Sequence, residues 1–327
     1  MYSAITVSRA ARLLSALLLF AFSWPAIAQE KYPSRPIEFI VPWGPGGGAD
    51  QLARKAAKLM EEDLKVSLPV VNSAGATGNT GMAKLLAGPA DGYSISIMTW
   101  DTYALLATSP SVRWGLKDII PVALMIKQPS SFLTAVNGKL KTWADVEREA
   151  KQRPLKVAVT GFGSPDDITV NYFIARGLKL ISVPFANPGE RYTAVLGGHA
   201  DVLYEQIGDV RSFVDSKQIA PVIVFAEKRF EVFPDVPASK ELGYDITLPQ
   251  RRAVIMKAGT DPQKVKVIAN ALKKVAASAE YKAYLKDQYA TDDSYFDSAE
   301  SLKIMEEELA QMKKIAASAT AAPAAPK

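Results

Sequence analysis

The sequence predicts an α/β fold of two lobes, each a mainly parallel sheet flanked by helices. Three observations support this prediction. Short runs of β-forming residues alternate with helical patterns along the chain, which is typical of parallel sheets. Glycine-bearing loops join several strands to the helices that follow them. A late strand over 253–258 is expected to return to the first lobe, which predicts a hinged protein with its ligand between the lobes.

The clearest unit is an apolar strand over 37–41, which Pro42 ends because proline has no N–H to give to a sheet. Gly46, Gly47 and Gly48 follow, and a helical pattern continues to residue 64. A helix that begins on bare backbone presents free N–H groups and a positive dipole end, so we interpret this turn as an anion site. The alternative is a plain tight turn, which needs only one or two glycines.

A second unit of the same kind follows about thirty residues later. It has a short strand over 68–72, a glycine-rich loop over 73–81 and a helix over 82–87. If the two strands are neighbours in a parallel sheet, both loops lie at the same edge and their N–H groups converge.

Polar residues at other strand ends are further candidates, because ligands of α/β proteins bind at the carboxyl edge of the sheet. Thr99 and Asp101 lie where the strand over 93–100 ends. The loop over 161–167 separates a strand from a helix that begins near Ile168. The aspartates of that loop either cap the helix or face the pocket, and the sequence leaves both options open.

Composition excludes several classes of function. The 327 residues suffice for two domains of ordinary size, and the net charge of +5 falls to +3 without Arg9 and Arg12 of the predicted signal segment. Such a small excess does not favour nucleic acid as a partner. The chain has no cysteine and one histidine, His199, which we expect at the surface. We therefore expect no metal site and no cofactor.

Residues 1–28 have the pattern of a secretory signal. Two arginines precede a short apolar run from Leu13 to Phe22, and Ala26–Ala28 forms a small-x-small cleavage site. We expect a mature chain that begins at Gln29, is free in the periplasm and has no lipid anchor, since there is no cysteine to carry one. A retained membrane anchor is the alternative. The low-complexity segment 318–327 is expected to be disordered.

A series of motifs carries a family resemblance over about residues 32–315. They are YPSRPIEFIVPWGPGGGAD, NSAGATGNTG, PADGYSI, IIPVALM, VPFANPGERYTAVLGGHADV, FPDVPASKELGYD and KAGTDPQKVKVIANALKKV. In this order they resemble the solute-binding receptors of tripartite tricarboxylate transporters, the Bug family. The resemblance implies a Venus-flytrap periplasmic binding protein fold, no enzymatic activity, and a monomer that captures a small organic acid and delivers it to a membrane permease.

The resemblance also refines the expected domains and site. We expect lobe 1 over 29–127 and 251–317, and lobe 2 over 128–250. In that family, the two glycine loops of lobe 1 hold a carboxylate through backbone N–H groups and water, and a loop resembling 161–167 adds contacts from lobe 2. The predicted ligand-binding residues are Trp43, Gly46, Gly47, Gly48, Asp50, Ala76, Thr77, Gly78, Asn79, Thr99, Asp101, Gly161, Phe162, Gly163, Ser164, Asp166, Asp167, Asn187 and Glu205.

The acidic residues of lobe 2 suggest an unusual ligand. Family members often carry histidine where Asp167 stands, and Glu205 adds a second negative charge at a strand end. Because like charges repel, we hypothesise a ligand with one carboxylate and a neutral or cationic far end. Arg251 and Arg252 either offset these charges or lie at the surface.

Two other functions remain open at this point. The segment 44–49 fits the G-x-G-x-x-G/A dinucleotide pattern, but Asn72 stands where an acidic residue would end the next strand. A receptor that signals to a sensor protein, without a permease, would have the same sequence features as a transport receptor.

Overall fold

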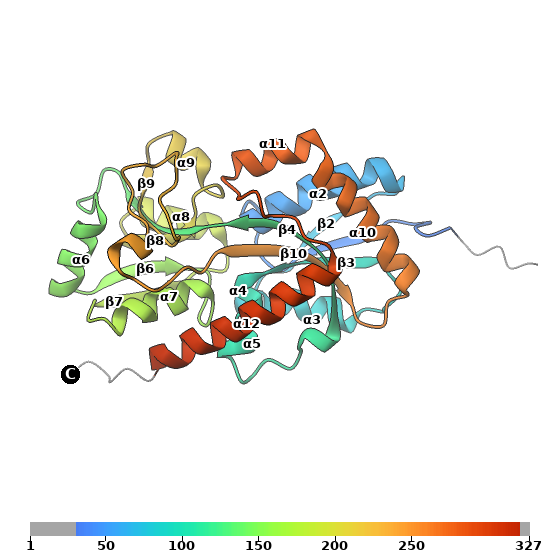
Figure 1. Ribbon diagram of the computed structural model, residues 1–327, viewed down its shortest axis with the longest axis horizontal. Helices are drawn as coiled ribbons and strands as arrows, with labels where there is room; N and C mark the ends of the chain where they lie inside the picture. Colours follow the sequence, from blue (N-terminus) through green and yellow to red (C-terminus); the bar gives the residue numbers. More distant parts are fainter. Residues whose placement is uncertain (1–30, 321–327) are drawn as a thin grey trace, which may run out of the picture. The chain divides into compact units, whose positions relative to one another are not determined.

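The structure is a computed structural model that describes residues 31–320. The predicted signal segment and residues 321–327 of the predicted tail lie outside this range. Two five-stranded sheets form the framework (Figure 1). No helix in the described range is long and apolar enough to cross a membrane.

The first sheet has the strand order β2-β1-β3-β10-β4. The β1, β2 and β3 strands pair in parallel, and β10 pairs antiparallel with both β3 and β4. The predicted return of a late strand to this sheet is therefore confirmed. The strands are β1 (Glu38–Val41), β2 (Val70–Asn72), β3 (Ser94–Thr99), β4 (Ile119–Gln128) and β10 (Gln250–Lys257).

The second sheet repeats this pattern with the order β7-β6-β8-β5-β9. The β6, β7 and β8 strands pair in parallel, and β5 pairs antiparallel with β8 and β9. The strands are β5 (Ser130–Ala135), β6 (Leu155–Val159), β7 (Leu180–Pro184), β8 (Val202–Gln206) and β9 (Ile219–Val224).

Both sheets are thus mixed, although most of their strands run in the same direction, in agreement with the predicted α/β fold. Four strands of each sheet point the same way, and one reversed strand (β10 or β5) lies between two of them. The reversal follows from the crossovers, because β5 enters the second sheet directly from β4 and β10 re-enters the first sheet from the second.

Helices cover both faces of each sheet (Figure 1). In the first sheet α2 and α10 pack on one face and α3 on the other. In the second sheet α6 and α7 lie on one face and α8 and α9 on the other. The longer helices are α2 (Gly48–Leu64), α3 (Asn79–Ala87), α6 (Trp143–Gln152), α7 (Pro165–Ile174), α8 (Pro188–Leu196), α10 (Pro262–Ala277), α11 (Ala279–Asp287) and α12 (Ser298–Thr320).

The shorter helices include α4, which continues directly from β3, and α5, which follows it. The short segments are η1 (Ala76–Gly78), α4 (Trp100–Tyr103), α5 (Leu105–Thr108), η2 (Leu116–Asp118), α9 (Arg211–Asp215) and η3 (Lys240–Leu242). The sequence did not reveal α4, α5 or α11, because short helices and a helix broken only at Ser278 have little periodicity of their own.

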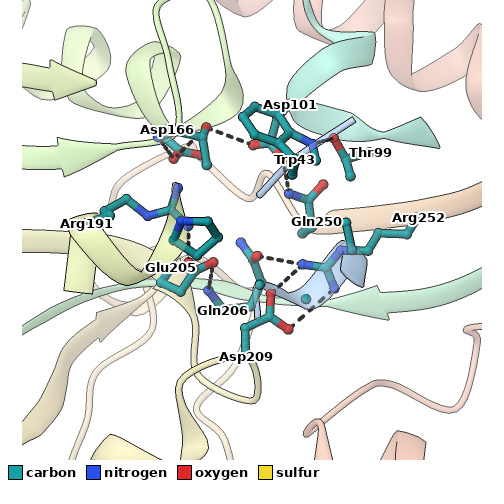
Figure 2. Close-up of a pocket in the computed structure, with 15 residues that line it drawn as sticks. Trp43, Thr99, Asp101, Asp166, Arg191, Glu205, Gln206, Asp209, Gln250 and Arg252 are labelled. Carbon is teal, nitrogen blue, oxygen red and sulfur yellow. Dashed lines mark hydrogen bonds and ion pairs between the residues drawn. The ribbon is translucent and has the colours of Figure 1, made fainter. Parts of the chain in front are cut away.

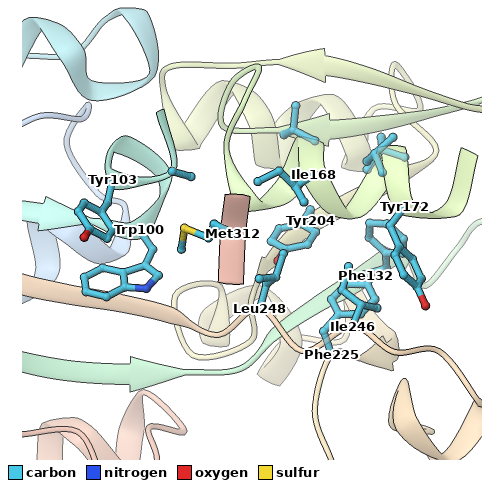
Figure 3. Close-up of a cluster of buried hydrophobic side chains, with 14 of the residues drawn as sticks. Trp100, Tyr103, Phe132, Ile168, Tyr172, Tyr204, Phe225, Ile246, Leu248 and Met312 are labelled. Carbon is cyan, nitrogen blue, oxygen red and sulfur yellow. The ribbon is translucent and has the colours of Figure 1, made fainter. Parts of the chain in front are cut away.

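The last helix, α12, contacts elements of both sheets. It packs against β4 and α5 of the first and α7 of the second. Figure 3 shows Met312 of this helix between Trp100 and Tyr103 on one side and Ile168 on the other, all within one buried apolar cluster. Trp100 is therefore a core residue. The helix extends to Thr320, so the first three residues of the predicted tail are helical rather than disordered.

Candidate ligand-binding site

The predicted anion turn lies where β1 leads into α2. Gly46 has a φ of +85°, a conformation that favours glycine. The helix begins at Gly48 with Gly47 as its N-cap, and no side chain caps it. Its first backbone N–H groups therefore lack the usual side-chain acceptor, which leaves the positive end of the helix dipole available to an anion.

The other two glycines are required because the second sheet comes very close. A Cβ on Gly47 would lie 2.6 Å from Pro188 Cγ, and one on Gly48 would lie 2.1 Å from Asp209 Oδ2. Any larger residue here would force the two sheets apart. The two lobes are thus in direct contact across this turn, and the carboxylate of Asp209 sits against the start of α2.

A small pocket lies at this junction, with a cavity volume of about 30 Å³. That volume holds about two water molecules. Elements of both sheets contribute side chains, four of which are carboxylates and two guanidinium groups (Figure 2). The lining residues are Trp43, Gly47, Gly48, Ala49, Thr99, Asp101, Thr160, Asp166, Pro188, Arg191, Glu205, Gln206, Asp209, Gln250 and Arg252.

One buried ion pair crosses between the sheets. Arg252 of β10 bonds to Asp209, which follows β8, and both side chains are at most 3% exposed. Gln128 of β4 accepts from Arg252 and donates to Asp209 Oδ1 at 3.1 Å. Arg252 also donates to Gln206 Oε1 at 3.2 Å. These hydrogen bonds connect β4 and β10 of the first sheet with the end of β8 in the second sheet.

A second buried ion pair lies within the second lobe. Arg191, near the start of α8, bonds to Glu205 at the end of β8, and Tyr192 donates its hydroxyl to the same carboxylate oxygen at 2.9 Å. Arg191 is 4% exposed, and its Nε has no hydrogen-bond partner among the described residues. The guanidinium group therefore keeps an unused buried donor at a residue that lines the pocket, as does that of Arg252.

The remaining two carboxylates, Asp101 and Asp166, come from opposite sheets. Thr160 Oγ1 lies 3.2 Å from Asp101 Oδ1 and 3.0 Å from Asp166 Oδ2, and so connects them (Figure 2). Asp166 also accepts from Thr160 N at 2.8 Å, and Gln250 donates to Asp101. Burial, followed by repulsion from Asp101, raises the pKa of Asp166 well above its usual value.

Several predicted site residues line this pocket. Trp43 donates its indole N–H to Thr99 Oγ1 at 3.0 Å, which fixes the rim next to the α2 turn. Asp166 lines the pocket, and the cap of α7 is Ser164 instead. The predicted residues that the structure brings together here are Trp43, Gly47, Gly48, Thr99, Asp101, Asp166 and Glu205.

The remaining predicted residues of the first lobe lie outside the lining. Asp50 is buried but accepts from Gly46 N, Arg54 and Asn72. In the second glycine loop, Asn79 accepts from Trp114 Nε1 at 2.8 Å. The others in this group are Gly46, Ala76, Thr77 and Gly78.

The loop over 161–167 also lies mostly outside the lining, at a contact between the lobes. Thr77 Oγ1 lies 3.4 Å from Phe162 O, and a Cβ on Gly161 would lie 2.3 Å from the same Oγ1. Ser164 caps α7, and Asp167 accepts from Gly163 N and from Ser182 Oγ.

Asn187 is the last predicted contact outside the lining. It donates to Glu190 Oε1 at 3.1 Å, and a Cβ on Gly44 would lie 2.6 Å from its Oδ1. It is thus a contact between lobes at the edge of the pocket.

Sequence reasoning missed most of the residues that form the pocket's charge network. The sequence left two options open for Arg251 and Arg252, and the surface option is wrong: both are buried, Arg252 pairs with Asp209, and Arg251 pairs with Glu308 at 2.8 Å. Arg191 lies near the start of α8, where the helix dipole disfavours a positive charge. Such a residue needs an anionic partner, and the sequence alone could have indicated this. The residues missed as contacts are Ala49, Thr160, Pro188, Arg191, Gln206, Asp209 and Gln250.

Comparison with known proteins identifies the family. The family described as "Tripartite tricarboxylate transporter family receptor" matches residues 52–320. The chain belongs to this family. Protein BugT of Bordetella pertussis is 30% identical over 251 residues, which are 75% of this receptor and 77% of BugT.

Solved structures show the same fold. MatC of Rhodopseudomonas palustris with bound malate has a TM-score of 0.80 at 21% identity, covering 87% of this receptor and 100% of MatC. An R. palustris protein with adipate has a TM-score of 0.81 at 22% identity, covering 88% and 98%. The predicted two-lobed periplasmic binding protein fold is confirmed, and the family is one of receptors rather than enzymes.

Two further interpretations of the sequence can now be judged against the geometry. The dinucleotide interpretation of 44–49 is wrong, because the family is not enzymatic and Pro188 and Asp209 fill the space beside this turn. His199 is exposed, as expected. Among the described residues, no group of three or more His, Cys, Asp or Glu could hold a metal ion.

Proposed function

We propose that this receptor captures a small organic acid between its two lobes in the periplasm and delivers it to the permease of a tripartite tricarboxylate-type transporter. The expected lobes are 29–127 with 251–317, and 128–250. The proposal rests on membership of the receptor family and on one geometric observation: the charged pocket is built from both sheets and has a cavity volume of only about 30 Å³.

The pocket's size requires a conformational change. A cavity of about 30 Å³ is smaller than any dicarboxylate, so a ligand enters only when the sheets separate. The β4 strand ends at Gln128 and β5 begins at Ser130, while β10 begins at Gln250. These adjacent crossovers are where a hinge would bend, because a hinge is formed by a few residues at element ends.

Two groups offer binding to a carboxylate. The uncapped start of α2 provides backbone N–H groups, and Arg191 provides an unused buried donor. Related structures contain malate and adipate, which are both carboxylates. These groups bind the carboxylate of the ligand. The other side chains of the pocket contact the rest of the ligand.

A thermal-shift screen of residues 29–327 against mono-, di- and tricarboxylic, aromatic and amino acids tests the proposal. A ligand that binds only the folded form stabilises it by about 2.7 kcal/mol at a hundredfold excess over Kd, which raises Tm by about 5 °C. A rise with one class of acid is expected. No rise with any acid would contradict the proposed function.

A further inference from the structure

The charges of the pocket do not balance. Asp101, Asp166, Glu205 and Asp209 are each at most 7% exposed, against only two arginines. Glu205 is paired with Arg191, and Asp209 with Arg252. Both pairs are internally neutral, which leaves two carboxylates without a cation.

The two uncompensated carboxylates are neighbours. Asp101 and Asp166 share the hydroxyl of Thr160, and their other side-chain and backbone partners, Gln250 and Thr160 N, are neutral. Neither forms an ion pair among the described residues. Burial without a counter-charge is costly, so such a pair needs a proton or a cation. Burial raises the pKa of both groups.

This differs from the reason that the sequence suggested for an unusual ligand. Asp167 is engaged by Gly163 N and Ser182, outside the pocket, and Glu205 is neutralised by Arg191. The unbalanced charge therefore lies at Asp101 and Asp166 instead.

An independent observation indicates a ligand with an acceptor as well. Arg191 and Arg252 both line this pocket, and the Nε of each is buried without a hydrogen-bond partner in the described range. A buried donor without a hydrogen bond is destabilising, so a bound acceptor would be favoured there. The pocket thus has two carboxylates without a cation and buried N–H donors without an acceptor.

We propose that the ligand is a zwitterion whose ammonium group binds between Asp101 and Asp166 and whose carboxylate is held by Arg191 and the start of α2. This inference rests on the proposed function and specifies its substrate class as small amino acids. A dicarboxylate without an amine would add negative charge beside two uncompensated carboxylates. A metal ion does not fit as the cation, because the acidic side chains in the described residues form no metal-binding group.

Matched ligand pairs test the inference on the unmodified receptor. Calorimetric titration would compare alanine with propionate, aspartate with succinate, glutamate with glutarate, and 4-aminobutyrate with butyrate. The amino member of at least one pair should bind about tenfold to a hundredfold more tightly, because a site that pairs with a polar group rejects the analogue lacking it.

Three outcomes are distinguishable. Preference for the amino member supports the inference. If the members without nitrogen bind as tightly or more tightly, the inference is wrong and the proposed function stands. If no member of any pair binds, the inference is wrong, and the thermal-shift screen decides whether the proposed function stands.

Isosteric variants locate the effect. Asp166→Asn and Asp101→Asn should each weaken binding of the amino member at least about tenfold while leaving or improving the affinity for its partner without nitrogen. Asp235→Asn, at an exposed aspartate outside the pocket, is the matched control and should change neither affinity. Equal weakening of both members by Asp166→Asn, with the variant folded by circular dichroism, would overturn the inference.

Discussion

The two halves of the pocket rest on the same strand pattern but contribute different chemistry. Both lobes contribute charged side chains, Asp101 and Arg252 from the first and Asp166 and Arg191 from the second. The first lobe adds bare backbone, since Gly47 and Gly48 open α2 without a capping side chain. Backbone N–H groups donate to any carboxylate, whereas charged side chains distinguish one acid from another. We therefore expect the start of α2 to set the affinity for acids in general, and the charged side chains of both lobes to select among them.

The buried contact between the halves should have the largest effect on stability. Arg252→Gln leaves the carboxylate of Asp209 buried without its cation, and we expect a loss of about 3 kcal/mol in the free energy of unfolding. Urea denaturation measures it. Lys274→Gln removes an exposed ion pair with Asp63 and should cost less than about 1 kcal/mol. Equal losses in the two variants would show that the buried contact between the lobes contributes no more to stability than an exposed ion pair.

The close approach at α2 should affect both ligand affinity and stability. In Gly48→Ala the new methyl group overlaps Asp209 when the lobes are closed, so ligand affinity should fall about a hundredfold, and Tm of the free protein should also fall because the overlap strains the contact of Asp209 with Arg252. Gly189→Ala places a methyl in the first turn of α8, where no atom lies within 4 Å, and serves as the control. Unchanged affinity in the Gly48 variant would mean that binding does not need this closure.

The buried carboxylate of Asp166 should make the stability of the protein depend on pH in a distinctive way. The raised pKa of Asp166, caused first by burial and then by Asp101, means that the folded protein holds a proton which the unfolded chain has lost. Arg191 opposes this shift and Glu205 reinforces it. Wild-type stability therefore falls as pH rises from about 4, the ordinary aspartate pKa, towards the raised folded-state value.

The Asp166→Asn variant lacks this titration. Its free energy of unfolding relative to wild type should increase as the pH is raised above about 4.5 and become constant once the pH exceeds the raised folded-state pKa, measured by urea denaturation at each pH up to about 8. A constant difference across that range would show that Asp166 is already ionised at the lower end.

The smallest effect is expected at Phe162. This side chain is 62% exposed and lies outside the pocket, although the sequence placed it among the ligand contacts. Phe162→Ala should change ligand affinity less than about twofold, since surface substitutions away from a site have small effects. A tenfold loss in calorimetric titration would return this loop to the binding site.

The sequence allowed us to predict the features that neighbouring residues determine. The β1 strand, the glycine turn and α2 are contiguous, so their order alone indicates an uncapped helix start. The return of the strand over 253–258 to the first lobe was also predicted, and β10 is that strand. The family resemblance then supplied the two-lobed arrangement.

The charge network could not be predicted in the same way. Arg252 and Asp209 are distant in the chain and meet only because two sheets close on each other. Arg252 precedes an apolar run and looked like a surface residue because its partner comes from the other lobe. Periodicity reports which face of an element is buried, and it does not report which charges meet across an interface.

Closure around a ligand is the central claim, and small-angle X-ray scattering tests it most directly. The radius of gyration of residues 29–327 would be measured without ligand and with a saturating acid identified by the thermal-shift screen. We predict that it decreases on binding, because the lobes must open for a ligand to reach the pocket and close to contact it from both sheets. An unchanged radius of gyration at saturation would contradict the account.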